Sequence, residues 1–151
     1  MPDQSSFDYA IVRIVPEVER EEFINAGVIL RCRELRFLAA QVELDCARLR
    51  ALAPDLDQEM VQAELDLIPL VCAGGSAAGP LGELDQAERF RWLTSPQSTT
   101  VQVSPVHCGL CDDPQAELDD LFRKMVKYSK DGASCPIPAK RISSSNPAST
   151  F

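Results

Sequence analysis

The segment from His107 to Cys111 holds the residue types in this chain that are best suited to metal binding or catalysis. It reads His-Cys-Gly-Leu-Cys, and Cys108 and Cys111 have the two-residue gap with which one turn can offer two thiolates to zinc. His107 could supply a third ligand, but no second matched pair of ligands occurs elsewhere in the sequence. A structural zinc site needs four ligands, so we predict no metal site and no bound cofactor.

His107 is also the single histidine of the chain, and Ser104 lies three residues before it. A histidine can act as the general base that activates a serine hydroxyl. No nucleophile-elbow motif surrounds Ser104, which weakens this interpretation. A small hydrolase or transferase that uses His107 and Ser104 is therefore an alternative hypothesis.

Two arginines alternate with aromatic residues in residues 88–93, which read Glu-Arg-Phe-Arg-Trp-Leu. A pair of guanidinium groups can grip a carboxylate or a phosphate, so Arg89, Arg91 and Trp92 are candidate binding residues. In the enzyme hypothesis, Arg89 and Arg91 form an anion clamp. The other interpretation is an amphipathic helix that buries its aromatic residues while its arginines pair with acidic side chains.

A glycine-rich stretch at residues 74–82 contains Gly79 and Gly82, which we also count as candidate binding residues. Phosphate-binding loops follow a strand and open a helix. Here the glycines follow a predicted helix, and the carboxylates of Glu83 and Asp85 at the start of the next helix would repel phosphate. We therefore predict a loop between two helices rather than a phosphate-binding loop.

The composition is that of one acidic globular domain. The 151 residues include 15 Lys and Arg against 23 Asp and Glu, giving a net charge of -8, and 45% of the residues are hydrophobic. This charge repels a phosphate backbone, so nucleic-acid binding is the least favoured function. No apolar run approaches the length of a membrane span, and the N-terminus lacks a secretory signal pattern, so we expect a cytoplasmic protein whose six cysteines are free thiols.

The periodicity of the apolar residues predicts an α+β fold. The β-rich segments that predict strands are residues 7–15, 27–32, 35–40 and 98–103. A short helix should begin after Asp45 and end at Pro54, and the longer helical segments are residues 57–72, 83–93 and 114–128. Pro69 predicts a kink or an early stop in the helix over residues 57–72. We expect a small, mainly antiparallel sheet of three to four strands with helices packed on one face.

The last part of the chain differs in composition from the rest. Residues 132–151 contain five serines, three prolines and no acidic residue, with few apolar side chains to pack. We expect one α+β domain over residues 1–131, followed by a disordered tail over residues 132–151.

Several motifs taken together resemble a bacterial family. They are Tyr-Ala-Ile-Val-Arg-Ile-Val-Pro at residues 9–16, the run at 18–30, Gly-Gly at 74–75, Gly-Pro-Leu-Gly at 79–82, the arginine segment at 88–93 and Ser-Pro-Val-His at 104–107. Over residues 7–128 the chain is similar to the domain of unknown function 3037, DUF3037. The resemblance supplies no reaction; it implies a small cytoplasmic bacterial protein with a HipA-like kinase as its partner.

An acidic domain without a complete catalytic set or an assembled metal site fits a binding role better than catalysis. We therefore predict a non-enzymatic accessory protein that acts by binding another protein. The hydrolase or transferase based on His107 and Ser104 remains the alternative.

Overall fold

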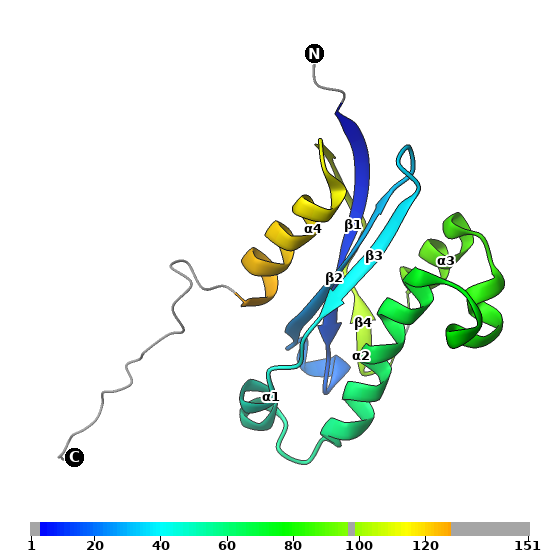
Figure 1. The fold of residues 1–151 in the computed structure, drawn as a ribbon. Coiled ribbons are helices and arrows are strands. Elements are labelled where there is room, and N and C mark those ends of the chain that lie inside the picture. The colour runs from blue at the N-terminus through cyan, green and yellow to red at the C-terminus, as the bar shows by residue number, and fades with distance from the viewer. Residues whose placement is uncertain (1–3, 97–98, 128–151) are drawn as a thin grey trace.

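The computed structural model describes residues 4–96 and 99–127, which form an antiparallel sheet with helices on both faces (Figure 1). The predicted tail, the domain boundary at residue 131 and Cys135 lie outside the described residues. The strands are β1 (Ser5–Ile14), β2 (Ile24–Cys32), β3 (Phe37–Val42), β4 (Val101–Val103) and β5 (His107–Cys111). The α-helices are α1 (Cys46–Leu52), α2 (Gln58–Ala73), α3 (Gln86–Leu93) and α4 (Pro114–Phe122). Shorter helical turns are η1 (Val18–Arg20), η2 (Ser76–Glu83) and η3 (Arg123–Lys127).

Strand β1 is the centre of the sheet, whose order is β3-β2-β1 with two strands sharing the far edge of β1. There β4 pairs with the second half of β1, matching Val12 with Val103, and β5 pairs with the first half, matching Tyr9 with His107. The near-continuous apolarity of β1 reflects this position, because a strand with neighbours on both edges and helices over both faces is buried throughout.

The two faces of the sheet carry separate hydrophobic clusters. Val12 and Ile14 of β1 pack with α2 and α3, whereas Phe7 and Ile11 of the same strand pack with Leu118 of α4. The α+β class and the antiparallel sheet are therefore confirmed. The details differ from the prediction: the sheet has five strands, and the helices cover both faces rather than one (Figure 1).

Strand β5 is the element that the sequence analysis missed. Its exposed, cysteine-containing sequence has no β-branched run, and Gly109 at its centre argues locally against a strand. The tertiary structure needs this glycine, because a Cβ at Gly109 would lie 2.9 Å from the Phe7 Cζ atom on the neighbouring strand. Close packing of the Phe7 ring thus explains a glycine inside a strand.

The predicted hairpin between β2 and β3 is confirmed. Cys32 pairs with Phe37, so residues 33–36 form the turn, and the Arg36 N–H donates to the Arg33 carbonyl at 3.1 Å. Arg36 has a φ of 53°, the left-handed conformation that closes a four-residue turn. The second strand therefore begins two residues later than its apolar run suggested.

Aspartate side chains cap the α-helices at their N-termini. Asp45, Asp57, Asp85 and Asp113 each accept a hydrogen bond from a backbone N–H in the first turn of α1, α2, α3 and α4. The early stop predicted at Pro69 is wrong, because α2 continues to Ala73. Buried side chains before and after the proline hold both parts of the helix on the sheet and offset the lost hydrogen bond.

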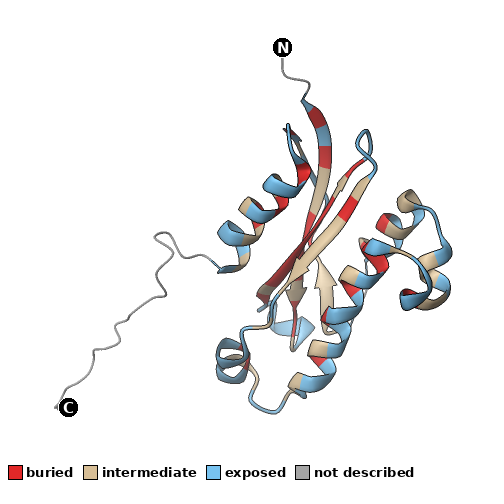
Figure 2. Ribbon diagram, in the orientation of Figure 1, coloured by how far each residue is buried: buried red, intermediate tan, exposed pale blue. Residues whose placement is uncertain are grey.

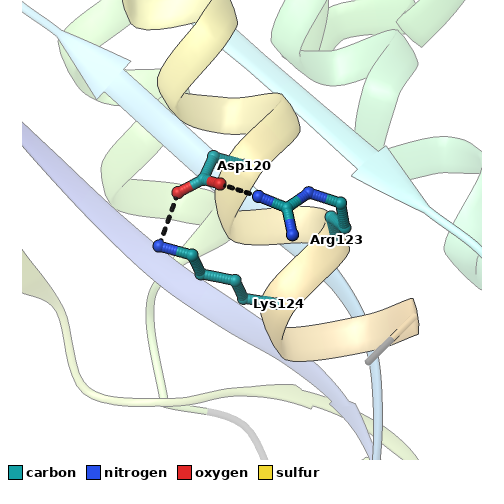
Figure 3. A network of polar contacts seen from close by, with 3 residues as sticks. All are labelled: Asp120, Arg123 and Lys124. Atoms are coloured by element: carbon teal, nitrogen blue, oxygen red, sulfur yellow. Dashed lines mark hydrogen bonds and ion pairs between the residues drawn. The ribbon is translucent and has the colours of Figure 1, made fainter. Parts of the chain in front are cut away.

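The end of α4 carries a small charge network (Figure 3). The Asp120 carboxylate forms ion pairs with Arg123 and, at 2.8 Å, with Lys124 Nζ. The hydrogen bond from Lys124, together with the charges of both cations, lowers the pKa of Asp120 below its ordinary value. One turn further, Lys127 Nζ lies 3.0 Å from a carboxylate oxygen of Glu43, which ties η3 to the end of β3.

Within the described ranges, no single helix has the length and apolarity of a membrane span. Helices α2 and η2 reach those limits only as a pair bent by 63°.

Candidate functional site

An apolar groove lies where α2, α3 and the short edge strand β4 meet. The side chains that form its apolar surface are Leu67, Ile68, Trp92, Leu93, Val101 and Val103. Its polar rim includes Glu64 and Ser95. We refer to this feature as the Trp92 groove.

The local structure explains why these side chains meet. Val101 and Val103 pair with Ile14 and Val12, so both valines project from the face of the sheet that α2 and α3 cover. Gln102, between them, projects from the opposite face. In Figure 2, β4 is intermediate in burial while the centre of the sheet is buried.

Helix α3 buries two of its large side chains and exposes the third. Phe90 and Leu93 are buried in the core, whereas Trp92 remains 39% exposed. The interpretation in which all the aromatic residues of this helix are buried is therefore wrong for Trp92. Positions 90 and 93 lie three residues apart on one face, and position 92 is rotated away from it.

The size of the Trp92 groove indicates what it can hold. Its volume is about 170 Å³. Small-molecule sites begin at roughly 300 Å³. The groove is therefore suited to one or two apolar side chains of another protein rather than to a whole substrate.

The outer edge of β4 offers backbone groups beside the groove. Val15 N–H donates to the Thr100 carbonyl, and Ser104 N–H donates to the Ile11 carbonyl. Because hydrogen-bonded positions alternate along an antiparallel strand, residues 100, 102 and 104 point their backbone groups toward β1. The N–H and carbonyl of Val103 consequently face away from β1. An extended segment of another chain could pair with this edge while its side chains enter the groove.

Arg89 and Arg91, which the sequence suggested as an anion clamp, do not converge. Arg89 Nε donates to the Leu84 carbonyl at 2.9 Å, and Nη1 donates to the carbonyls of Val71 and Cys72 at 2.9 and 2.5 Å. Arg89 thus closes the C-terminal end of α2. Arg91, two positions along the same helix, is exposed and projects in another direction.

Gly79 and Gly82 shape the connection between α2 and α3. The predicted loop is a helical turn, η2, and the Gly75 N–H donates to the Gly82 carbonyl at 3.0 Å. A Cβ at Gly82 would overlap the Gly75 carbonyl oxygen, and Gly79 adopts a φ of 69° with ψ of -148°, a conformation reserved for glycine. The conformation of the turn is therefore sufficient to explain both glycines.

Ser104 and His107 occupy different environments. The Ser104 hydroxyl is buried, accepts a hydrogen bond from the Ile11 N–H at 2.9 Å and donates to the Pro105 carbonyl at 2.9 Å. It completes the pairing of β1 at the break between β4 and β5. His107 is exposed and packs on the Tyr9 ring with centroids 5.3 Å apart, and no hydrogen bond joins it to Ser104 in the described part of the chain.

The cysteines of the His-Cys-Gly-Leu-Cys segment are separated by the strand geometry. Cys108 is exposed and Cys111 is buried, because residues three apart in a strand project from opposite faces. Among residues 4–96 and 99–127, no three His, Cys, Asp or Glu side chains come together as a metal site. Burial raises the pKa of Cys111, with nearby acidic groups adding to the shift, and burial raises that of Cys72 to about 12, so both remain thiols at neutral pH.

These features define a small α+β domain with a side-chain-sized apolar groove beside an edge strand. The family described as "Protein of unknown function (DUF3037)" matches residues 9–126, and the chain belongs to this family. No curated protein and no solved structure matches the chain.

Sequence reasoning identified Trp92 but missed the residues that surround it. Leu67 and Ile68 were assigned to a helix, and Val101 and Val103 to a strand, with no indication that they share a groove. The alternation of Val101, Gln102 and Val103 shows which positions share a face. Only the strand order places that face beside α2 and α3.

Proposed function

We propose that this chain is a non-catalytic accessory protein that binds an extended segment of a partner protein along β4 and the Trp92 groove. The observation that carries the proposal is a strand edge of β4 that pairs with no other described strand, beside a groove of about 170 Å³ that holds a partly exposed tryptophan. Backbone pairing to the edge would supply affinity, and the groove would select an apolar side chain. A HipA-like kinase is the first partner to test, because the resemblance of the sequence implies it.

The chemistry of the groove defines the segment that it accepts. Trp92 and the two valines of β4 favour a branched or aromatic side chain at the position that enters the groove. Glu64 at the rim and the net charge of -8 favour basic residues on either side of that position. The proposed ligand is therefore an extended, apolar segment flanked by lysine or arginine.

The first test removes the groove side chain. Trp92→Ala should weaken partner binding by about 2–4 kcal/mol, the range for a central aromatic anchor. Leu110→Ala is the matched control, because Leu110 is 63% exposed and lies on β5. Both variants should retain the wild-type circular dichroism spectrum, and binding should be measured with the purified partner by isothermal titration calorimetry.

The second test addresses the strand edge. Val103→Pro removes an N–H that faces away from β1, so the sheet should remain intact while pairing to an added strand is lost. Val103→Ala trims the same side chain but keeps the donor. Partner binding that survives Val103→Pro as well as it survives Val103→Ala would contradict strand addition.

The same assays separate this function from the enzyme hypothesis. His107→Ala should leave partner binding and the cellular phenotype unchanged, because His107 lies on β5, outside the groove. A His107→Ala protein that binds its partner but has lost all cellular function would instead support catalysis.

A further inference from the structure

A second hollow lies beside the N-terminal end of α3 and is lined mainly by arginine. It is formed by the turn between β2 and β3 and by the first turns of α3, and its volume is about 520 Å³. Its lining residues are Arg31, Arg33, Arg36, Asp85, Gln86, Ala87 and Arg89. We refer to this feature as the arginine pocket.

The arginine pocket concentrates positive charge on an acidic protein. Four arginines and one aspartate give its lining a formal charge of +3, in a chain with a net charge of -8. The four ion pairs among the described residues involve none of these arginines. Like charges gathered in one pocket repel one another, and an anionic ligand would offset this repulsion.

The walls of the pocket are fixed by contacts around it. Gln86 Nε2 donates to the Arg36 carbonyl at 2.8 Å, which holds the turn against α3. Arg89 is anchored by three backbone carbonyls at the end of α2 and between the helices. These contacts leave less motion to be lost when a ligand binds.

Arg31 is poised to donate to a ligand. Its side chain projects from β2 on the face that α3 covers, with the guanidinium carbon 6.0 Å from the centroid of the Phe90 ring. Its Nε atom is buried and has no hydrogen-bond partner among residues 4–96 and 99–127. Asp8 on β1 is its cross-strand neighbour, but the two side chains form no ion pair in the described structure. A buried donor without an acceptor is a costly arrangement. Because Arg31 lines the pocket, a shift of its side chain toward a bound anion would give this donor an acceptor.

We infer that the arginine pocket binds the phosphate group of a small, polar phosphorylated molecule. A phosphate monoester carries close to two negative charges and three acceptor oxygens, which suits several guanidinium groups better than a single carboxylate does. The volume falls within the range of small-molecule sites. Within the part of the chain that the structure describes, no aromatic side chain lines the pocket, so we expect the rest of the ligand to be polar. The second carboxylate oxygen of Asp85 can accept a hydrogen bond from one of its hydroxyls.

The primary experiment measures binding of inorganic phosphate and of glycerol phosphate to the full chain, by calorimetry and by NMR of the arginine Nε–H groups. We expect dissociation constants of about 1 mM or tighter. Arg31→Gln and Arg33→Gln should each weaken binding about tenfold or more, the loss expected for one charge-assisted hydrogen bond. Arg50→Gln, at an exposed arginine on α1, is the matched control and should bind as the wild type does.

Two further probes test the specificity of the site. Acetate should bind at least about tenfold more weakly than phosphate, because it carries one charge and two oxygens. A phosphoserine peptide should bind no more tightly than glycerol phosphate. Because Arg33 is exposed on the turn, Arg33→Gln keeps the test decisive even if Arg31→Gln does not fold.

Several results would overturn the inference. They are the absence of phosphate binding at about 10 mM, equal losses in Arg50→Gln, NMR shifts confined to arginines outside the pocket, and acetate binding as tight as phosphate binding. A phosphoserine peptide that binds tenfold more tightly than glycerol phosphate would refute the assignment to a small molecule.

Discussion

The side chain of Arg89 should determine how firmly the end of α2 is held, which makes Arg89→Ala the sharpest test of the folded structure. Arg89 donates to the carbonyls of Val71 and Cys72 in the last turn of α2, and to Leu84 before α3. Such terminal carbonyls have no partner within their own helix. The substitution removes all three bonds and the positive charge that complements the C-terminal end of the helix dipole.

The magnitude follows from the number of bonds and their exposure. A hydrogen bond to a charged group contributes about 1.5–3 kcal/mol. Arg89 is only half-buried, so water replaces part of what is lost, and we expect the free energy of unfolding to fall by about 2–4 kcal/mol in total. For a domain of this size, the melting temperature should fall by roughly 5–15 °C.

Urea unfolding followed by circular dichroism measures this loss directly. Arg91→Ala is the matched control, because Arg91 is an exposed arginine on the same helix and its substitution should cost under about 0.5 kcal/mol. Arg89→Lys keeps the charge but lacks the planar guanidinium group that donates to several carbonyls at once. The free energy of unfolding of this variant should therefore lie between those of the wild type and Arg89→Ala.

Two results would refute this reasoning. A free energy of unfolding for Arg89→Ala within about 0.5 kcal/mol of that for Arg91→Ala would show that the three bonds contribute nothing measurable. Full stability in Arg89→Lys would show that charge alone, rather than the hydrogen-bond geometry, holds the end of the helix.

Two further changes test other parts of the fold. Lys124 and Arg123 lower the pKa of Asp120, so its carboxylate stabilises the folded state at every pH above its ordinary pKa of 3.8. This contribution is lost as the pH falls through the lower pKa of the folded state. Asp120→Asn should therefore reduce the melting temperature at neutral pH and progressively less in acid; an equal reduction at every pH would contradict the ion pairs. Ser104→Ala leaves the buried Ile11 N–H without its acceptor and should cost about 1–3 kcal/mol in urea unfolding, whereas Ser6→Ala at an exposed position should cost little; equal losses would argue against the structural role of the Ser104 hydroxyl.

Local physics accounts for the elements that the sequence predicted correctly. Asp45 and Asp57 precede helices because their short carboxylates satisfy first-turn N–H groups, which needs no tertiary contact. The apolar runs around Arg33 and Glu34 similarly predicted the β2–β3 hairpin. The errors occurred where distant residues decide, as at Pro69, which packing on the sheet keeps inside a helix, and at Gly109, which the Phe7 ring keeps inside a strand.

The candidate sites depended still more on tertiary structure. The sequence marked Trp92 and the arginines as residues able to bind, but a guanidinium can serve equally as a ligand clamp or as the cap of a neighbouring helix. The fold decided between these roles for Arg89 by placing the carbonyls of α2 within its reach. The fold also brought the turn at Arg33 against α3. The hydrogen bond from Gln86 Nε2 to the Arg36 carbonyl joins residues fifty positions apart in the chain.

The sequence by itself determined the α+β class, the antiparallel hairpin, the helix starts and the acidic character of the chain, because these depend on residue type and short-range spacing. The tertiary structure decided that helices cover both faces, that β4 and β5 share one edge of β1, and which side chains line the Trp92 groove and the arginine pocket. The physical reason is that a strand's pattern specifies which residues share a face, whereas the order of strands and the helices above them are set by contacts between residues far apart in the chain.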